Sequence, residues 1–265
     1  MIVLIPMGGL GTRFRDAGYL INKPSIPTFD RNTGKTVKMI IAAMNDIPKI
    51  NDPETKIICI NRDFHAVDGT EAAILEQFPQ TIFVHDHVLL DQAFACLLAR
   101  EFLMSDDELF IGVCDSGMVL NLDDFSEKKR RYDVLMISHR GDENISKNPN
   151  AHSWAELNEN SEELKLLSIK QPISENYMVD HATTGMFWFK HARSFIDLLE
   201  TMLSADGAIR KKQVVDNVIN YAIAEGMKVS FIDVKYICWG TPIDFEEYQA
   251  TCDYWKNYVK SNEWL

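Results

Sequence analysis

A glycine-rich segment with two cations nearby is the strongest chemical signal in the 265-residue sequence. It runs from Gly8 to Arg13 (GGLGTR) directly after an apolar run, and Lys23-Pro24 follows ten residues past Arg13. Glycines let the backbone approach a ligand closely and offer N–H groups to phosphate oxygens, while the two side chains add positive charge. The segment therefore predicts a polyphosphate site rather than a purely structural turn.

Two familiar nucleotide motifs do not fit the sequence. A dinucleotide fingerprint needs a third glycine where Phe14 stands, and Gly18 and Pro24 argue against a helix beginning there. Gly34-Lys35-Thr36 ends like a P-loop, but the required first glycine falls at Phe29 and no strand precedes the segment. We expect this second segment to be the start of a helix.

The overall composition excludes a general attraction to nucleic acid or anionic lipid. The chain has 39 acidic and 27 basic residues, a net charge of −12, so any anion must be met by a local site. The opening apolar run, Ile2 to Met7, is too short for a signal peptide, and no other run approaches a membrane span. The five cysteines are scattered without a C-x-x-C pair, which favours a reducing, cytoplasmic location.

The elements that must position the site are predicted by the apolar pattern. In the first half, strand-like runs without clean alternation are separated by stretches of helical period, as in a doubly wound sheet buried on both faces. The strands are Ile2–Pro6, Lys56–Ile60, Thr81–Val84 and Leu109–Val113, and the helices are Val37–Met44, Ala72–Phe78 and Gln92–Leu103.

The second half mixes strands and helices, and no linker separates it from the first. The polar stretch Gly141–His152 is expected to be a surface loop. We therefore predict a single α/β domain with a mixed, mostly parallel, doubly wound sheet and flanking helices. Its later strands are Val134–His139, Ser153–Leu157, Leu164–Ile169, Met186–Phe189 and Lys228–Val234, and its helices are His191–Leu203, Gln213–Glu225 and one after Gly240-Thr241-Pro242.

The order of motifs along the chain resembles the sugar-phosphate nucleotidyltransferases, including the glucose-1-phosphate thymidylyltransferases. The family signature of a glycine-rich loop, Thr-Arg and then Lys-Pro is followed here by four further matching segments, which extend the resemblance over nearly the whole chain. These are Leu90–Phe94, Val113–Asp115, His181–Phe187 and Trp239–Pro242. The subgroup found with capsule and surface-polysaccharide biosynthesis is the most similar in character.

The resemblance implies a Rossmann-like fold and an Mg²⁺-dependent pyrophosphorylase reaction. Such an enzyme transfers a nucleoside monophosphate from a triphosphate to a phosphorylated sugar or polyol, and residues 1–120 would bind the nucleotide and 121–265 the acceptor. Gln92 carries the donor and acceptor that suit a base edge. The implied roles are nucleotide binding by Gly8, Gly9, Gly11, Thr12 and Gln92, catalysis by Arg13 and Lys23, metal binding by Asp115, and acceptor binding by Lys170, Thr184 and Gly185.

Two positions depart from the family pattern. The acidic residue expected before Lys170 is Ile169, and the second metal-binding carboxylate is replaced by Cys238, whose thiol is a poor Mg²⁺ ligand. Asp233 and Asp244 lie nearby in sequence, but neither stands at the position of the missing second carboxylate. Either another carboxylate completes the site, or Asp115, water and substrate phosphates hold the ion.

These departures leave two other classes of function open. A glycosyltransferase of related fold would consume a sugar nucleotide, although Asp115-Ser116-Gly117 lacks the usual Asp-x-Asp motif. A non-catalytic nucleotide-binding protein would tolerate Ile169 and Cys238. Aromatic residues that gather late in the chain are candidates for the contact of a homo-oligomer: Tyr248, Tyr254, Trp255 and Tyr258.

Three further clusters are interpreted as structural. His85-Asp86-His87 has the alternation of metal ligands at a strand end, but no third ligand has a recognisable spacing, so a polar loop is favoured over a zinc site. The basic run Lys128–Arg131 follows acidic residues and is expected to be a solvated helix end. Phe187-Trp188-Phe189, with Trp154 and Trp239, is expected in the core or a pocket wall.

Overall fold

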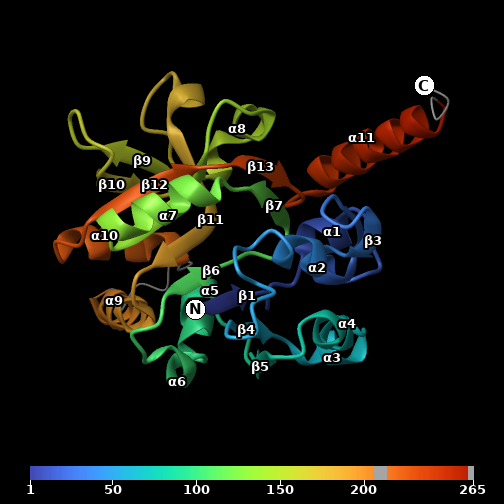
Figure 1. The fold of residues 1–265 in the computed structure, drawn as a ribbon, viewed down its shortest axis with the longest axis horizontal. Coiled ribbons are helices and arrows are strands. Elements are labelled where there is room, and N and C mark those ends of the chain that lie inside the picture. Colours follow the sequence, from blue (N-terminus) through green and yellow to red (C-terminus); the bar gives the residue numbers. More distant parts are fainter. Residues whose placement is uncertain (206–213, 262–265) are drawn as a thin grey trace.

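A computed structural model of the chain describes residues 1–205 and 214–261, and a nine-stranded sheet forms its centre (Figure 1). The strands follow the order β10-β9-β11-β6-β1-β4-β5, and β8 joins β11 to β12. The strands are β1 (Ile2–Pro6), β4 (Lys56–Asn61), β5 (Thr81–His85), β6 (Leu109–Ile111), β8 (Val134–His139), β9 (Trp154–Leu157), β10 (Leu164–Ser168), β11 (His181–Phe189) and β12 (Val229–Asp233).

Most strands of this sheet run in one direction. β1 is parallel to β4 and β6, β4 is parallel to β5, and β8 is parallel to β12. β11 is antiparallel to β6, β8 and β9, and β10 is antiparallel to β9, so only β10 and β11 oppose the other strands of the sheet. The predicted mixed, mostly parallel α/β sheet is confirmed, and this one sheet takes strands from both halves of the chain.

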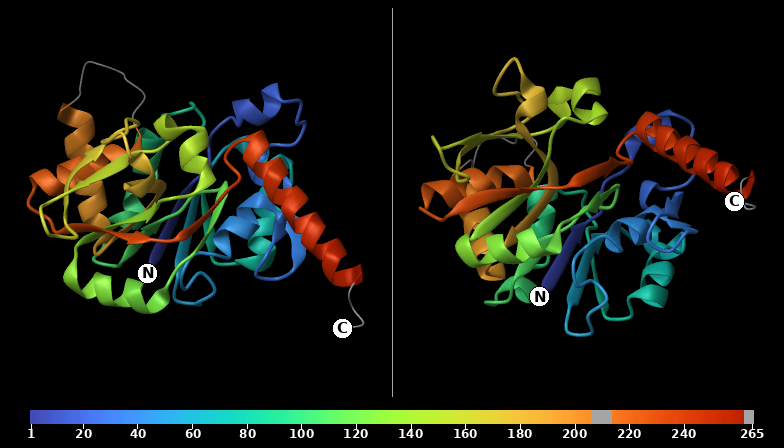
Figure 2. Two further views of the ribbon diagram at one scale, coloured as in Figure 1. Left: turned by 90° about the horizontal axis from the view of Figure 1, so that it is seen from above. Right: turned by 45° about the horizontal axis from the view of Figure 1, so that its top comes forward.

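Helices cover both faces of the sheet (Figure 2). Ile2 and Leu4 of β1 pack into one hydrophobic core, while Val3 and Ile5 pack into the other. This two-sided burial explains why the strands read as continuous apolar runs. The first core includes α5 (Gln92–Leu97), α6 (Arg100–Leu103), α9 (Ala192–Ala205) and α10 (Val218–Ala224), and the second includes α2 (Met39–Met44), α4 (Thr70–Gln77) and α7 (Leu122–Arg131).

The segment around Gly34 is a hairpin, which corrects the expected helix start. β2 (Pro27–Asp30) pairs with β3 (Lys35–Lys38), and α2 begins only at Met39. The carboxylate of Asp30 accepts hydrogen bonds from the Asn32 amide and the Thr33 hydroxyl, and Gly34 has φ 70°. An aspartate that accepts hydrogen bonds within its own turn and a glycine at positive φ favour a turn over a helix.

A second small sheet pairs β7 (Ser116–Val119) with β13 (Lys235–Cys238).

Several other helices differ from expectation. A five-residue helix, α1 (Thr12–Asp16), does begin after the glycine-rich loop, because Gly11 adopts the left-handed conformation that the bend needs. The predicted helix Gln92–Leu103 is divided into α5 and α6, where Ala99 leaves helical geometry at φ −89° and ψ 8°. Gln213, the expected start of a late helix, lies outside the described residues, and η4 (Val215–Asn217) leads into α10.

The polar stretch expected as a loop contains a short helix, α8 (Glu143–Lys147). Asp142 caps it by accepting hydrogen bonds from the Asn144 and Ile145 amides, and Ile145 is fully buried. A cap and one buried anchor thus suffice to fold a segment whose composition favours a loop. The remaining short elements are η1 (Lys23–Ser25), α3 (Asp63–Val67), η2 (Pro149–Ala151) and η3 (Tyr177–Val179).

The basic run at the end of α7 is less solvated than expected. Lys128 is buried, and its ammonium group donates to the Phe231 carbonyl at 3.0 Å. Lys129 forms an ion pair with Glu108. Long lysine stems can cover apolar surface while their charged heads find partners, which composition alone does not reveal. The aromatic prediction is confirmed, because Trp154, Phe187, Trp188, Phe189 and Trp239 are all buried.

The C-terminal helix α11 (Pro242–Ser261) extends away from the sheet (Figures 1 and 2). Its first half packs on the hairpin and on the segment after α1: the Tyr248 hydroxyl donates to the Phe29 carbonyl, and the Tyr19 hydroxyl donates to Glu246. Tyr254 and Trp255, farther along, are exposed. The subunit contact expected there stays a prediction. In the described part of the chain, no helix is long and apolar enough to cross a membrane.

Candidate active site

The glycine-rich loop lies at the carboxyl end of β1, where open α/β sheets bind ligands. Gly11 has φ 58°, and a Cβ atom there would lie 3.1 Å from Cβ of Lys23. A Cβ atom at Gly8 would lie 3.6 Å from Cγ of Arg62. Gly11 is therefore needed both for its conformation and for the close approach of Lys23.

The backbone of this loop offers hydrogen-bond donors that the fold does not use. Within residues 1–205 and 214–261, the amide groups of residues 8–13 donate to no other protein group. Farther along, the amides of Phe14 and Arg15 both donate to the Gly11 carbonyl. Gly9, Thr12 and Arg13 are exposed. Successive backbone N–H groups that have no protein acceptor and face solvent can all donate to one anion, so this row of donors is suited to an anionic ligand.

Lys23 connects the loop to the predicted metal ligand. Its Nζ lies 2.5 Å from Oδ2 of Asp115 and 2.9 Å from the Gly240 carbonyl oxygen, and it lies 5.3 Å from the centre of the Phe14 ring. The fold thus brings together residues 92 positions apart. Asp115 stands between the end of β6 and the start of β7, and its side chain is 31% exposed.

The charge of Lys23 is maintained despite its burial. Burial, the largest influence, lowers the pKa of Lys23, but the nearby Asp115 and Cys114 and the hydrogen bond to Asp115 raise it, so that it lies above its ordinary value. Arg13 is close enough for its charge to oppose that of Lys23. The site therefore holds two cations at neutral pH, and Asp115 compensates one of them.

Cys238 is not suited to bind a hard metal ion. A thiol is a soft ligand that Mg²⁺ does not favour, and burial, the largest influence, raises the pKa of this thiol to about 12. The sulfur accepts a hydrogen bond from the Gly240 amide and lies 3.6 Å from Oδ2 of Asp244. Asp244 in turn accepts a hydrogen bond from the Thr241 hydroxyl at 2.6 Å.

Asp233 is engaged elsewhere, with Ser138, His181 and Arg140. The partly exposed carboxylate of Asp115 fits an Mg²⁺ ion that keeps waters and substrate phosphates as its other ligands.

A partly buried ion pair that the sequence did not reveal supports the segment after Asp115. Arg31 makes a bidentate contact with Asp46, and Asp46 accepts a hydrogen bond from the Met118 amide at 2.8 Å. A Cβ atom at Gly117 would lie 2.6 Å from Oδ2 of Asp46, so only glycine fits there. The pair fixes β7, and with it the position of Asp115. No local signal distinguishes Arg31 or Asp46 from ordinary surface residues.

The predicted acceptor residues make contacts within the protein. The Lys170 ammonium donates to the Ala151 carbonyl and lies 4.0 Å from Asp216. The Thr184 hydroxyl is buried and donates to the Ile137 carbonyl at 2.9 Å. Gly185, at φ 84°, lies beside Val113, two residues before Asp115. Gly185 is thereby placed near the segment that carries Asp115. Gln92 is exposed at the first residue of α5.

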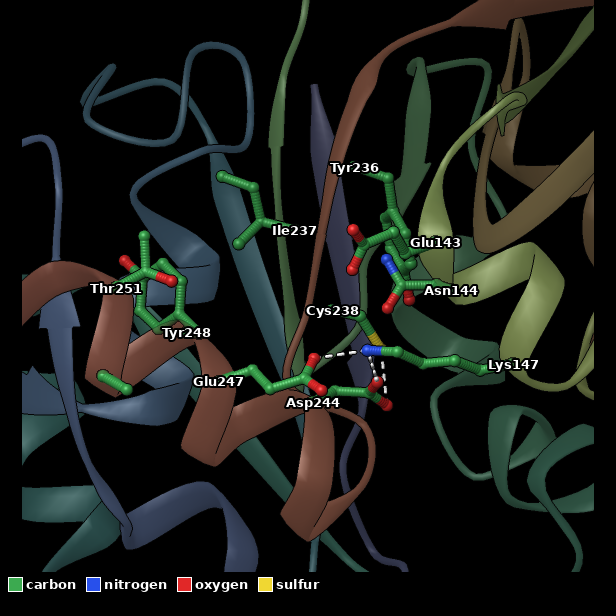
Figure 3. Close-up of a pocket in the computed structure, with 11 residues that line it drawn as sticks. Glu143, Asn144, Lys147, Tyr236, Ile237, Cys238, Asp244, Glu247, Tyr248 and Thr251 are labelled. Carbon is green, nitrogen blue, oxygen red and sulfur yellow. Dashed lines mark hydrogen bonds and ion pairs between the residues drawn. The ribbon is translucent and has the colours of Figure 1, made fainter.

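A cavity of about 520 Å³ that the sequence did not reveal lies between α8, β13 and α11 (Figure 3). It is lined by Cys238 and by three acidic side chains, Glu143, Asp244 and Glu247. Lys147 extends across it to Glu247 and to Asp244, whose Oδ1 lies 3.6 Å from its Nζ. None of the predicted acceptor residues lines this cavity.

Several solved structures with a similar fold are named for reactions of nucleotides or nucleotide sugars. A nucleoside-diphosphate-sugar pyrophosphorylase from Vibrio cholerae RC9 has a TM-score of 0.74 at 19% identity, over 94% of this chain and 100% of that one. A protein assigned as a glucose-1-phosphate thymidylyltransferase from Bacillus anthracis, in complex with a sucrose, has a TM-score of 0.71 at 16% identity, over 95% of each chain.

An inositol-1-phosphate CTP transferase from T. maritima has a TM-score of 0.66 at 16% identity, over 94% of this chain and 93% of that one. No family model matches the chain, and no curated protein matches it. The chain therefore has the fold of the nucleotidyltransferases and nucleotide-sugar pyrophosphorylases. The expected fold is confirmed, and the expected roles of individual residues stay predictions.

Proposed function

We propose that this chain is a nucleotidyltransferase that joins a nucleoside monophosphate to a phosphorylated small molecule, a sugar or polyol phosphate, and releases pyrophosphate. The observation that carries the proposal is the contact of Lys23 with Asp115 directly against Gly11. A cation, a carboxylate and a row of backbone donors that have no acceptor among the described residues lie together at one edge of the sheet. The resemblance to capsule-biosynthesis enzymes supports a role in surface-polysaccharide assembly.

The reaction needs position and charge rather than a protein nucleophile. An oxygen of the acceptor phosphate forms a bond to the α-phosphorus of the triphosphate, and the bond from that phosphorus to the bridging oxygen of pyrophosphate breaks. The glycine-loop amides and Arg13 bind the departing β- and γ-phosphates. Lys23, held in its charged form, stabilises the charge that develops at the α-phosphate.

Asp115 would hold the Mg²⁺ ion, which when bound neutralises charge on the phosphate oxygens. The thiol of Cys238 takes no part in binding Mg²⁺, because a soft sulfur ligand is a poor partner for this hard ion. Gln92 contacts the base, Lys170 and Gly185 contribute to the acceptor site, and Thr184 supports that site through its hydrogen bond to the Ile137 carbonyl. Lys170 is the charged residue among these three. Its ammonium group can bind the acceptor phosphate when it gives up its hydrogen bond to the Ala151 carbonyl.

Pyrophosphate release, measured with each common nucleoside triphosphate against a panel of phosphorylated metabolites, tests the proposal. We expect one triphosphate and one acceptor class to give turnover that requires Mg²⁺. Lys190→Ala is a matched control, because Lys190 is half-exposed and lies 3.8 Å from Asp133, outside the site.

Two other outcomes would contradict the proposal in different ways. Triphosphate binding without pyrophosphate release from any acceptor would identify a non-catalytic nucleotide-binding protein. Consumption of a sugar nucleotide with transfer of its sugar would identify a glycosyltransferase.

A further inference from the structure

A second cluster of metal-binding side chains lies outside the site described above. Asp63 begins α3, directly after β4, while His85 ends β5 and His87 follows two residues later. One possible ligand atom from each of the three lies within 4.8 Å of the others. β4 and β5 are parallel neighbours, with Asn61 opposite His85, so their carboxyl ends deliver these side chains to one place.

The side chains of this cluster lie close enough to share one metal ion. Nδ1 of His87 lies 3.1 Å from Oδ2 of Asp63, and Nδ1 of His85 lies 3.9 Å from Oδ1 of Asp63. Ligands about 2.0–2.1 Å from a tetrahedral zinc ion are separated by roughly 3.4 Å. The side chains of Asp63 and His87 are 69% and 66% exposed, so an ion has access from solvent.

His85 is oriented by polar groups behind it. Its Nε2 lies 2.7 Å from Oε1 of Glu71, and the same oxygen accepts a hydrogen bond from Nδ2 of Asn61, which is fully buried. When Nε2 carries the proton and donates to Glu71, Nδ1 presents its lone pair on the side of Asp63. A carboxylate behind a histidine in this way fixes the ring and raises its basicity as a ligand.

We propose that Asp63, His85 and His87 bind a divalent transition metal of the zinc class, with water in the fourth position. Imidazole nitrogens suit zinc, cobalt and nickel, whereas Mg²⁺ prefers oxygen ligands throughout. The site is therefore chemically distinct from the one at Asp115. The inference does not depend on the proposed enzymatic function, because it rests only on these side chains and their support.

The bound ion would connect two loops that the protein already joins through another pair. Asp86 lies between the two histidines, is buried, and accepts hydrogen bonds from the Val88 and Leu90 amides. Its carboxylate also lies 3.6 Å from the Arg62 guanidinium. These contacts shape the segment that leads into Gln92 and α5. A metal between Asp63 and the histidines adds a second connection and stabilises this arrangement.

Zinc binding by the full chain, stripped of metal by a chelator, tests the proposal through competition with a chromophoric zinc indicator. We expect one Zn²⁺ per chain. His87→Ala should weaken the affinity at least about 100-fold, and Glu71→Gln by roughly 10- to 100-fold through loss of orientation. His191→Ala is the matched control, since His191 also follows a strand and its imidazole hydrogen-bonds to the Asp106 carbonyl, away from the cluster.

Two further measurements keep the test decisive. Asp63→Ala removes an exposed ligand, so it should abolish binding without unfolding the chain, and Zn²⁺ should raise the melting temperature of the wild type but not of this variant. Cys238→Ser should bind zinc as the wild type does. The proposal is overturned if the wild type binds no zinc, if His87→Ala and Asp63→Ala bind it unchanged, or if Cys238→Ser loses it.

Discussion

The nucleotide side and the acceptor side of the candidate site differ in how the fold uses their polar groups. On the nucleotide side, the amides of residues 8–13 have no protein acceptor in the described part of the chain, and Arg13 is exposed. On the acceptor side, the Thr184 hydroxyl donates to Ile137 and the Lys170 ammonium to Ala151. Polar groups left unused by folding identify a binding surface more directly than residue type does.

The largest effect should come from Lys23, which faces both the loop and Asp115. We expect Lys23→Ala to lower kcat/KM for pyrophosphate release at least about 100-fold, equivalent to roughly 2.7 kcal/mol of transition-state stabilisation. Lys190→Ala should keep wild-type activity. Near-normal turnover of a folded Lys23→Ala protein would contradict the catalytic role of Lys23 on the nucleotide side.

The Arg13→Ala variant tests the nucleotide side at a residue whose side chain does not contribute to core packing. Because its side chain is exposed, Arg13→Ala should leave the free energy of unfolding within about 0.5 kcal/mol of wild type. Its kcat/KM should nevertheless fall roughly 100-fold, through lost stabilisation of the leaving phosphates. Urea unfolding and steady-state kinetics on the same sample measure both values. A stability loss with intact kinetics would make Arg13 a structural residue.

The acceptor half should also respond to acid, because it holds a buried neutral histidine. Burial, then the neighbouring His139, lowers the pKa of His152 to about 4. Since the unfolded state has the higher pKa, near 6.5, it binds the proton first, and stability falls as the pH drops from about 6.5 toward 4. We expect His152 to lower the free energy of unfolding by about 2 kcal/mol between pH 7 and pH 4.5.

Urea unfolding at both pH values, for the wild type and for His152→Gln, isolates this contribution. His65, in the nucleotide half, has a pKa lowered by burial to about 4 as well, so His152→Gln should flatten the pH dependence only in part. An identical pH dependence in variant and wild type would show that His152 does not carry it.

Lys170 tests whether the acceptor side has a usable charge. If its ammonium exchanges the Ala151 carbonyl for the acceptor phosphate, Lys170→Met should raise the KM for the acceptor roughly tenfold, or about 1.4 kcal/mol. The KM for the triphosphate should stay unchanged. Equal changes in both values would indicate that Lys170 supports the fold of the site rather than the acceptor.

The smallest effect is expected at Thr184, whose hydroxyl already donates a hydrogen bond within the protein. Thr184→Val keeps the shape of the side chain but removes its hydrogen bond to the Ile137 carbonyl, so the free energy of unfolding should fall by about 1 kcal/mol. The KM for the triphosphate should not change. Unaltered stability together with a raised KM for the acceptor would show instead that the hydroxyl serves the ligand.

The sequence predicted the sheet because local patterns encode it. Runs such as Ile57–Ile60 are apolar on both faces, and the glycine-rich loop joins β1 to the first helix. Long-range partners left no such pattern. Asp63 lies 22 residues before His85 on another strand's loop, and the contact of Arg31 with Asp46 depends on how the hairpin and α2 pack.

The acceptor side was the hardest to predict for the same reason. Whether a threonine or a lysine meets a ligand or a backbone carbonyl depends on neighbours brought in by strand pairing, as at Thr184 on β11. The helix α8 and the acidic cavity beside it arise from one cap at Asp142 and one buried Ile145. Neither signal stands out in a stretch of polar residues.

A crystal structure with a non-hydrolysable nucleoside triphosphate analogue and Mg²⁺ tests the central claim most directly. We predict the triphosphate against the amides of residues 8–13, with Arg13 on the terminal phosphates, Lys23 at the α-phosphate and the ion at Asp115. A triphosphate seated elsewhere, for example in the cavity of Figure 3, with the glycine-rich loop free of contacts, would contradict the account.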